Sequence, residues 1–100
     1  YTAPFLAHNI MEPTNTFAHV QGDKVRILGP IQGPDMVANT VAARLGIPKE
    51  NIEIELARMG GGFGRRAYGH YMVEAVLISP LSESPCWLIF KFTCPPVMRR

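Results

Sequence analysis

The chain has 100 residues, of which 47% are hydrophobic and 18% charged, and its formal net charge is +2. This length fits one domain at most, and the scattered basic residues exclude a stripe that would follow a phosphate backbone. Because no such stripe is present, we expect no nucleic-acid partner. No apolar run reaches the roughly 18 residues that span a bilayer, so we also expect no membrane span.

The first third of the chain predicts extended structure and a hairpin. Residues 1–20 are mostly extended, with a polar break at residues 11–15 whose default interpretation is a plain turn. A functional interpretation is that His8, Glu12 and an amide line a cleft. Gln21-Gly22-Asp23 is a turn signal, and the alternation of residues 24–28 then predicts a second strand.

A helix and another strand follow. The spacing of Val37, Val41 and Leu45 predicts an amphipathic helix that starts at Pro34 and ends at a left-handed Gly46 cap. Residues 51–58 then alternate, which predicts a strand with Ile52, Ile54 and Leu56 facing inward. Strand, helix and strand form a βαβ unit, for which we expect parallel strands and a right-handed crossover.

The last third predicts a buried helix over residues 68–79 and an apolar strand over residues 86–92. Cys86 and Cys94 are too far apart along an extended segment to pair, so they are expected to be free thiols. The predicted fold class is α/β (α+β), a mixed sheet of about four to five strands with two helices. Its predicted order is β-β-α-β-α-β.

The stretch Gly60-Gly61-Gly62-Phe63-Gly64-Arg65-Arg66 is the candidate site. It joins a predicted strand to a predicted helix, where free backbone N–H groups point at a ligand. The bland alternative is a flexible turn whose arginines serve solubility. Residues 62–67 also match the dinucleotide pattern G-x-G-x-x-[G/A], but the next strand lacks the acidic residue that would bind a ribose.

Other chemistry finds little support in the sequence, which shows no nucleophile motif and no metal-ligand spacing. What remains is a cradle of backbone N–H groups for an anion or oxo group, helped by the Gln32 amide. If the strands before the two loops are parallel neighbours, Gln32 lies close to Phe63 and Gly64 on one rim.

Three stretches carry a family resemblance: Phe5-Leu-Ala-His-Asn-Ile-Met-Glu-Pro13, Leu28-Gly-Pro-Ile-Gln32 and Arg58-Met-Gly-Gly-Gly-Phe-Gly-Arg-Arg66. In this order they resemble the molybdopterin-binding large subunit of the xanthine dehydrogenase/aldehyde oxidase family, in its bacterial isoquinoline 1-oxidoreductase-like branch. The resemblance covers residues 1–79. Residues 80–100 form a tail that diverges from the family pattern.

The resemblance implies a molybdenum cofactor, molybdopterin in its cytosine dinucleotide form, and an iron–sulfur subunit or domain as partner of the parent protein. It also implies that the parent hydroxylates an aldehyde or an N-heteroaromatic carbon with oxygen from water. The implied cofactor-binding residues are Gln32, Gly61, Gly62, Phe63, Gly64 and Arg65. No catalytic or metal-ligating residue is implied within the chain.

We therefore interpret residues 1–100 as a single fragment of a molybdopterin-binding domain, inactive and without cofactor on its own. Apolar faces predict a homo-oligomer, and the sequence leaves open whether the protein is cytoplasmic or periplasmic. The alternative hypothesis is a small non-catalytic α/β module that binds an anion or a protein partner through the loop at residues 60–66.

Overall fold

The computed structural model describes residues 2, 10–82 and 86–90. It is a mixed α/β structure with two helices, as the sequence predicted. The elements in chain order are β1 (Thr14–Gln21), β2 (Lys24–Gly29), α1 (Pro34–Leu45), the 3-10 helix η1 (Lys49–Asn51), β3 (Ile52–Leu56), α2 (His70–Ile78), the 3-10 helix η2 (Ser79–Ser82) and β4 (Cys86–Phe90).

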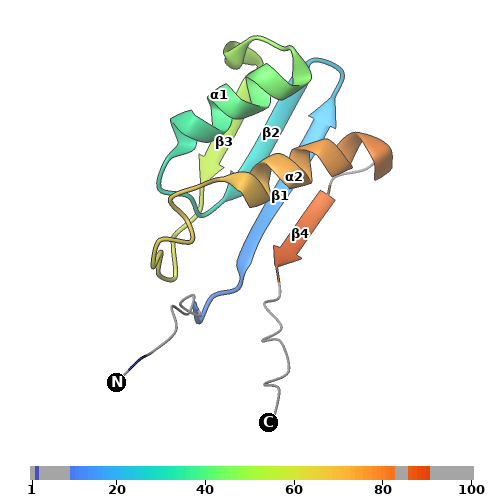
Figure 1. Cartoon of the computed structure of the whole chain (residues 1–100). Coiled ribbons are helices and arrows are strands. Elements are labelled where there is room, and N and C mark those ends of the chain that lie inside the picture. Colours follow the sequence, from blue (N-terminus) through green and yellow to red (C-terminus); the bar gives the residue numbers. More distant parts are fainter. Residues whose placement is uncertain (1, 3–9, 83–85, 91–100) are drawn as a thin grey trace.

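The strands form one sheet in the order β3-β2-β1-β4. β1 and β2 are an antiparallel hairpin, and β1 also pairs antiparallel with β4. β2 and β3 are parallel and are connected through α1, which confirms the predicted strand–helix–strand unit with parallel strands. Both helices lie on the same face of this sheet (Figure 1).

The core lies between that face and the two helices. Alternate residues of β1 and β2 point into it, including Ala18, Val25 and Ile27, which are at most 2% exposed. Residues three and four apart on each helix meet them, because this spacing repeats along one side of an α-helix. These helical residues are Val37 and Val41 of α1 and Tyr71, Met72, Ala75 and Val76 of α2.

Helix α1 has the predicted ends. Pro34 is its first residue, and Gly46 adopts the left-handed conformation at φ 68°. The Gly46 N–H donates to the Ala42 carbonyl at 2.9 Å, which satisfies a carbonyl of the last turn. Ile47 then packs against the core, so the chain turns back sharply toward β3.

Some boundaries and one orientation differ from the prediction. β1 begins at Thr14, inside the presumed polar break, because Thr14 pairs with Phe90 of β4. α2 covers residues 70–78 instead of 68–79, and a 3-10 turn extends it. The inward orientation of Leu56 was wrong, since 57% of this residue is exposed at the end of an edge strand that only β2 flanks.

Several predictions concern residues outside the described part of the chain. His8, Cys94 and the end of the predicted last strand at residues 91–92 belong to this group. Among the helices within residues 10–82, none is both long and apolar enough to cross a membrane.

Candidate functional site

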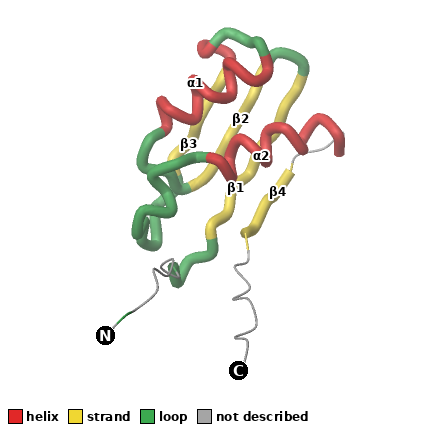
Figure 2. Tube along the Cα trace, viewed as in Figure 1, coloured by secondary structure: helices red, strands yellow, loops and turns green. Residues whose placement is uncertain are grey.

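Two loops leave the sheet at one edge and form the candidate site. Gly29 at the end of β2 pairs with Leu56 at the end of β3, and the Ala57 N–H donates to the Gly29 carbonyl at 3.2 Å. The parallel strands therefore end at the same level. The loop at residues 30–33 and the loop at residues 57–69 emerge beside each other (Figure 2).

Gln32 and the glycine loop are in direct contact. A Cβ atom on Gly62 would lie 3.0 Å from Oε1 and 3.3 Å from Cδ of Gln32, so the amide packs against the bare glycine backbone. The Gln32 N–H also donates to the Arg66 carbonyl at 2.9 Å. The structure thus confirms that the Gln32 loop and the glycine loop share one rim, with Gln32 in contact with Gly62 and Arg66.

The loop backbone adopts conformations that glycine favours. Gly61 and Gly64 have φ values of 98° and 76°, and the intervening Phe63 has a φ of 45°, which is uncommon for a residue with a side chain. The Arg65 N–H donates to the Gly62 carbonyl at 2.8 Å and closes the turn. Phe63 is 64% exposed, so this turn presents an aromatic ring and a strained backbone at the rim.

Arg66 does not face the rim. Arg65 and Arg66 both follow the glycine run, but the Arg66 side chain is fully buried. Its Nη1 donates to Oε2 of Glu12 at 2.5 Å, and its Nη2 donates to the Glu12 carbonyl at 3.0 Å. Arg65 is half-buried and remains on the loop. Only Arg65 of this pair is therefore retained as a candidate ligand-binding cation.

Glu12 has a role that neither sequence interpretation anticipated. Its Oε2 also accepts the Gly60 N–H at 2.5 Å, so one carboxylate oxygen binds both the glycine loop and the buried Arg66 side chain. The predicted cleft with His8 involves a residue outside the described part of the chain. The hydrogen bond from Arg66 holds the pKa of the Glu12 carboxyl below its usual range, with the Gly60 N–H adding to the effect. The acid before Pro13 gave no local signal of this partner, which is 54 residues away.

Buried Tyr71 fixes the loop that carries Gln32. Its hydroxyl donates to the Pro30 carbonyl at 2.5 Å, which attaches α2 to the segment after β2. Burial raises the pKa of Tyr71 to about 12, so the phenol stays protonated and continues to donate at neutral pH.

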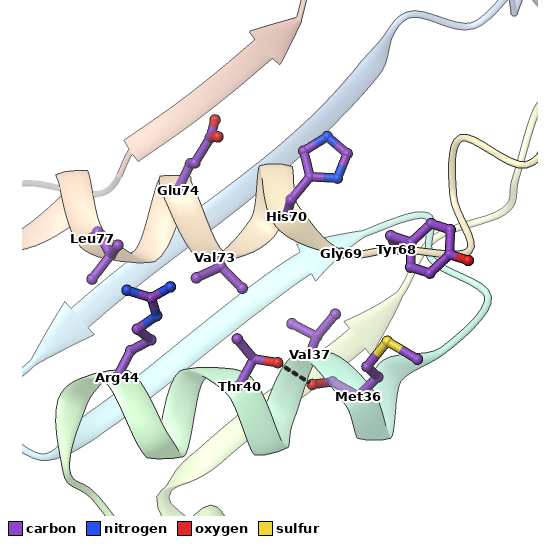
Figure 3. A pocket seen from close by; sticks show the side chains of 10 residues that line it. All are labelled: Met36, Val37, Thr40, Arg44, Tyr68, Gly69, His70, Val73, Glu74 and Leu77. Atoms are coloured by element: carbon purple, nitrogen blue, oxygen red, sulfur yellow. Dashed lines mark hydrogen bonds between the residues drawn. The ribbon is translucent and has the colours of Figure 1, made fainter. Parts of the chain in front are cut away.

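A separate groove of about 370 Å³ lies between α1 and α2. In Figure 3, Val73 and Leu77 of α2 point toward α1, while Thr40 and Arg44 of α1 point toward α2. None of the residues predicted to bind a cofactor lines this groove. Its lining residues are Met36, Val37, Thr40, Arg44, Tyr68, Gly69, His70, Val73, Glu74 and Leu77.

The comparison with protein families decides the identity. The family model described as the molybdopterin cofactor-binding domain matches residues 1–85. The chain belongs to this family. The resemblance to the xanthine dehydrogenase/aldehyde oxidase family is thereby confirmed. Of the three stretches that carry this resemblance, two form the rim described above.

Curated relatives of this molybdopterin cofactor-binding domain include aldehyde-oxidising proteins. The chain is 34% identical over 90 residues to the membrane-bound aldehyde dehydrogenase (pyrroloquinoline-quinone) of Gluconacetobacter polyoxogenes, covering 89% of this chain and 12% of that protein. It is 34% identical over 68 residues to the aldehyde oxidoreductase molybdenum-binding subunit PaoC of Escherichia coli K12, covering 68% of this chain and 9% of that protein. The chain thus spans about a tenth of these relatives.

A solved structure shows the same fold. Quinoline 2-oxidoreductase from Pseudomonas putida 86 matches 82% of this chain and 11% of its own, with a TM-score of 0.71 and 24% sequence identity. The match therefore supports the fold described above.

The residues on the rim fit a molybdopterin. Within the described ranges, no three His, Cys, Asp or Glu side chains gather as a metal site. The rim offers the Gln32 amide, backbone N–H groups and the Arg65 side chain, which suit a cofactor that brings its own metal ligands. A Cβ atom on Gly60 would lie 2.7 Å from Glu12, and one on Gly61 would lie 2.6 Å from Phe63, so only glycines permit the close packing of this loop.

Proposed function

We propose that this domain supplies part of the molybdenum-cofactor cradle of an aldehyde or N-heteroaromatic oxidoreductase. The observation that carries the proposal is the contact between the Gln32 amide and the bare backbone of Gly62. It places a side-chain amide beside a run of backbone N–H groups at the ends of two parallel strands. This edge of an open α/β sheet is where ligands bind.

Each rim residue has a distinct part in the proposal. Gln32 and the N–H groups of Phe63 and Gly64 would hold the cofactor by hydrogen bonds, and Gly61 and Gly62 would allow its close approach. Arg65 offers a guanidinium group to the anionic part of the cofactor. When bound, the cofactor supplies a molybdenum centre that hydroxylates carbon with oxygen from water.

The composition of the rim also bears on the substrate. In xanthine-type members of the family, a glutamate that binds substrate follows the glycine motif. Here Arg65, Arg66 and Ala67 occupy that region, and Arg66 is committed to Glu12. We therefore propose an aldehyde or N-heteroaromatic substrate rather than a purine.

The proposal extends to the parent protein and its partners. We propose the cytosine dinucleotide form of the cofactor and an iron–sulfur subunit or domain as electron acceptor. We also propose that the 100-residue chain, which spans about a tenth of its relatives, is inactive by itself. Metal analysis of the purified chain and an aldehyde assay with a dye acceptor test this: stoichiometric molybdenum together with turnover would contradict it.

Molybdenum content of the full-length parent tests the cradle. We expect Gln32→Ala, which removes the amide, and Gly62→Ala, whose methyl group would displace it, to lower bound molybdenum about 10-fold. Gly22→Asn is the matched control, because Gly22 lies in the β1–β2 turn with no atom within 4 Å of its Cβ position and a φ of 56° that asparagine tolerates.

Two outcomes would count against the cradle. Full molybdenum content in both rim variants would exclude these residues as cofactor-binding groups. A parent without molybdenum, whose loop still binds simple anions such as phosphate, would favour the alternative of a non-catalytic anion-binding module.

A further inference from the structure

Glu12 joins the two ends of the glycine loop, although it lies before β1 and far from the loop in sequence. Its Oε2 accepts one hydrogen bond from the Gly60 N–H and another from Nη1 of Arg66, each at 2.5 Å. Gly60 opens the run of glycines and Arg66 closes it. One carboxylate oxygen therefore fixes both ends of the segment that carries Gly61, Gly62, Phe63 and Gly64.

Arg66 passes this constraint to the second loop. Its side chain is held by Glu12, while its backbone carbonyl accepts the Gln32 N–H at 2.9 Å. The Gln32 side chain in turn lies against Gly62. Glu12, Arg66 and Gln32 are thus linked by direct contacts, and no other residue is needed to connect them.

The burial of Arg66 makes the carboxylate necessary. The Arg66 side chain is 0% exposed, and within the described residues its Nε has no hydrogen-bond partner. The Glu12 carboxylate supplies the charge that compensates the guanidinium group. Removal of one partner from a buried pair leaves an uncompensated charge in the interior. By contrast, the pairs Arg26–Glu55 and Lys49–Asp35 have side chains that are 49–89% exposed, and such pairs contribute little.

We propose that the Glu12–Arg66 ion pair is the positioning device of the cradle, setting where the glycine loop lies relative to the Gln32 amide. The two residues do not touch the cofactor in this proposal; they act through Gly60, Gly62 and Gln32. The inference rests on the proposed function for the meaning of the cradle, but its geometric content concerns this chain alone.

NMR spectra of the cofactor-free 100-residue chain test the proposal. We expect the backbone N–H signals of Gly60 and Gln32 to move together during an acid titration, because both respond to the charge on Glu12. Among the described residues, the groups near that carboxylate are the Arg66 guanidinium group, the Asn15 amide and the Tyr71 phenol, which stays protonated. A purely stabilising role of Glu12 would not couple the Gln32 signal to this titration.

Substitutions supply the second measurement. We expect Glu12→Gln to shift the signals of Gly60 and Gln32 and to abolish the nuclear Overhauser contact between the Gln32 amide protons and the Gly62 α-protons. Signals of the β1–β2 hairpin should remain in place. Glu55→Gln is the matched control, since it removes one carboxylate charge from an exposed pair.

The outcomes separate this inference from the proposed function. The positioning proposal is overturned if the Gln32 N–H signal does not move together with the Gly60 N–H signal during the acid titration. It is also overturned if a folded Glu12→Gln chain keeps the Gln32–Gly62 contact. If Glu12→Gln fails to fold, the wild-type titration alone decides. None of these measurements contains molybdenum, so a parent that binds no molybdenum would overturn the cofactor cradle and leave the positioning device intact.

Discussion

Arg65 and Arg66 are adjacent residues that occupy different environments. Arg66 is fully buried against Glu12, whereas Arg65 lies half-buried on the loop. Both guanidinium groups follow the same glycine run, so local composition cannot distinguish them, and the carboxylate that selects Arg66 lies 54 residues away. The sequence thus predicted the loop as a site, but it could not show which arginine supports the loop from within.

The Glu12 carboxyl predicts how the stability of the chain responds to acid. Its pKa is lowered from 4.5, chiefly by the hydrogen bond from Arg66, so the unfolded state binds this proton more readily. The stabilisation by Glu12 is therefore complete above pH 4.5 and is lost as the pH falls through the lowered folded-state pKa. We expect the urea midpoint of the wild type to decrease across this acidic range.

In the same urea titrations, Glu12→Gln should have a lower midpoint at neutral pH and a weaker dependence on acid. Glu55→Gln, at an exposed pair, should stay within about 0.5 kcal/mol of the wild type at neutral pH. If the urea midpoints of wild type and Glu12→Gln decreased equally with acid, the lowered pKa of Glu12 would not be a source of stability.

At the scale of elements, periodicity predicted the strand–helix–strand unit well because local signals agree there. Pro34 starts α1, Gly46 ends it, and alternation marks the next strand. The errors arose where partners distant in sequence decide the outcome. Thr14 joins β1 because of β4, and Leu56 is exposed because β3 is an edge strand. The shared edge of the Gln32 loop and the glycine loop followed from the parallel strands, whereas no sequence pattern indicated the contact of Glu12 with Arg66.

Gly69 allows the N-terminal ends of the two helices to approach each other. A Cβ atom at this N-cap of α2 would lie 2.0 Å from Cγ2 of Val37, a fully buried residue in the first turn of α1. We therefore expect Gly69→Ala to destabilise the chain by about 1–3 kcal/mol in urea unfolding, through overpacking.

The equivalent glycine of α1 is the control. Gly33 is the N-cap of α1, and a Cβ atom there would meet Ala67 and Met36 at ordinary distances of 3.6 and 3.9 Å. Gly33→Ala should change the free energy of unfolding by less than Gly69→Ala. Similar losses in both variants would indicate that backbone propensity, and not the helix contact, determines the cost.

At the scale of the whole molecule, apolar surface gathers around the groove between the helices. Met36, Tyr68 and Leu77 are 52%, 65% and 41% exposed, and all three line the groove. Exposed apolar surface of this kind promotes association, so we propose that the isolated chain forms a homo-oligomer.

Light scattering at micromolar concentration tests this association. We expect a mass above the 11.1 kDa of the single chain, and a shift toward that mass in Leu77→Lys. Met11→Lys is the control, because Met11 is 97% exposed but does not line the groove. A wild-type chain that scatters as a monomer would refute the proposal.

The contact between Glu12 and Arg66 also has a consequence for the order of folding. Residues of the β1–β2 hairpin are close in sequence, so the hairpin closes with little loss of chain entropy, whereas the Glu12 contact must close a loop of 54 residues. During synthesis the hairpin can form as soon as it leaves the ribosome, but the rim is complete only after Arg66 has emerged. A nascent chain therefore has no complete rim until Arg66 has emerged and its side chain has reached Glu12.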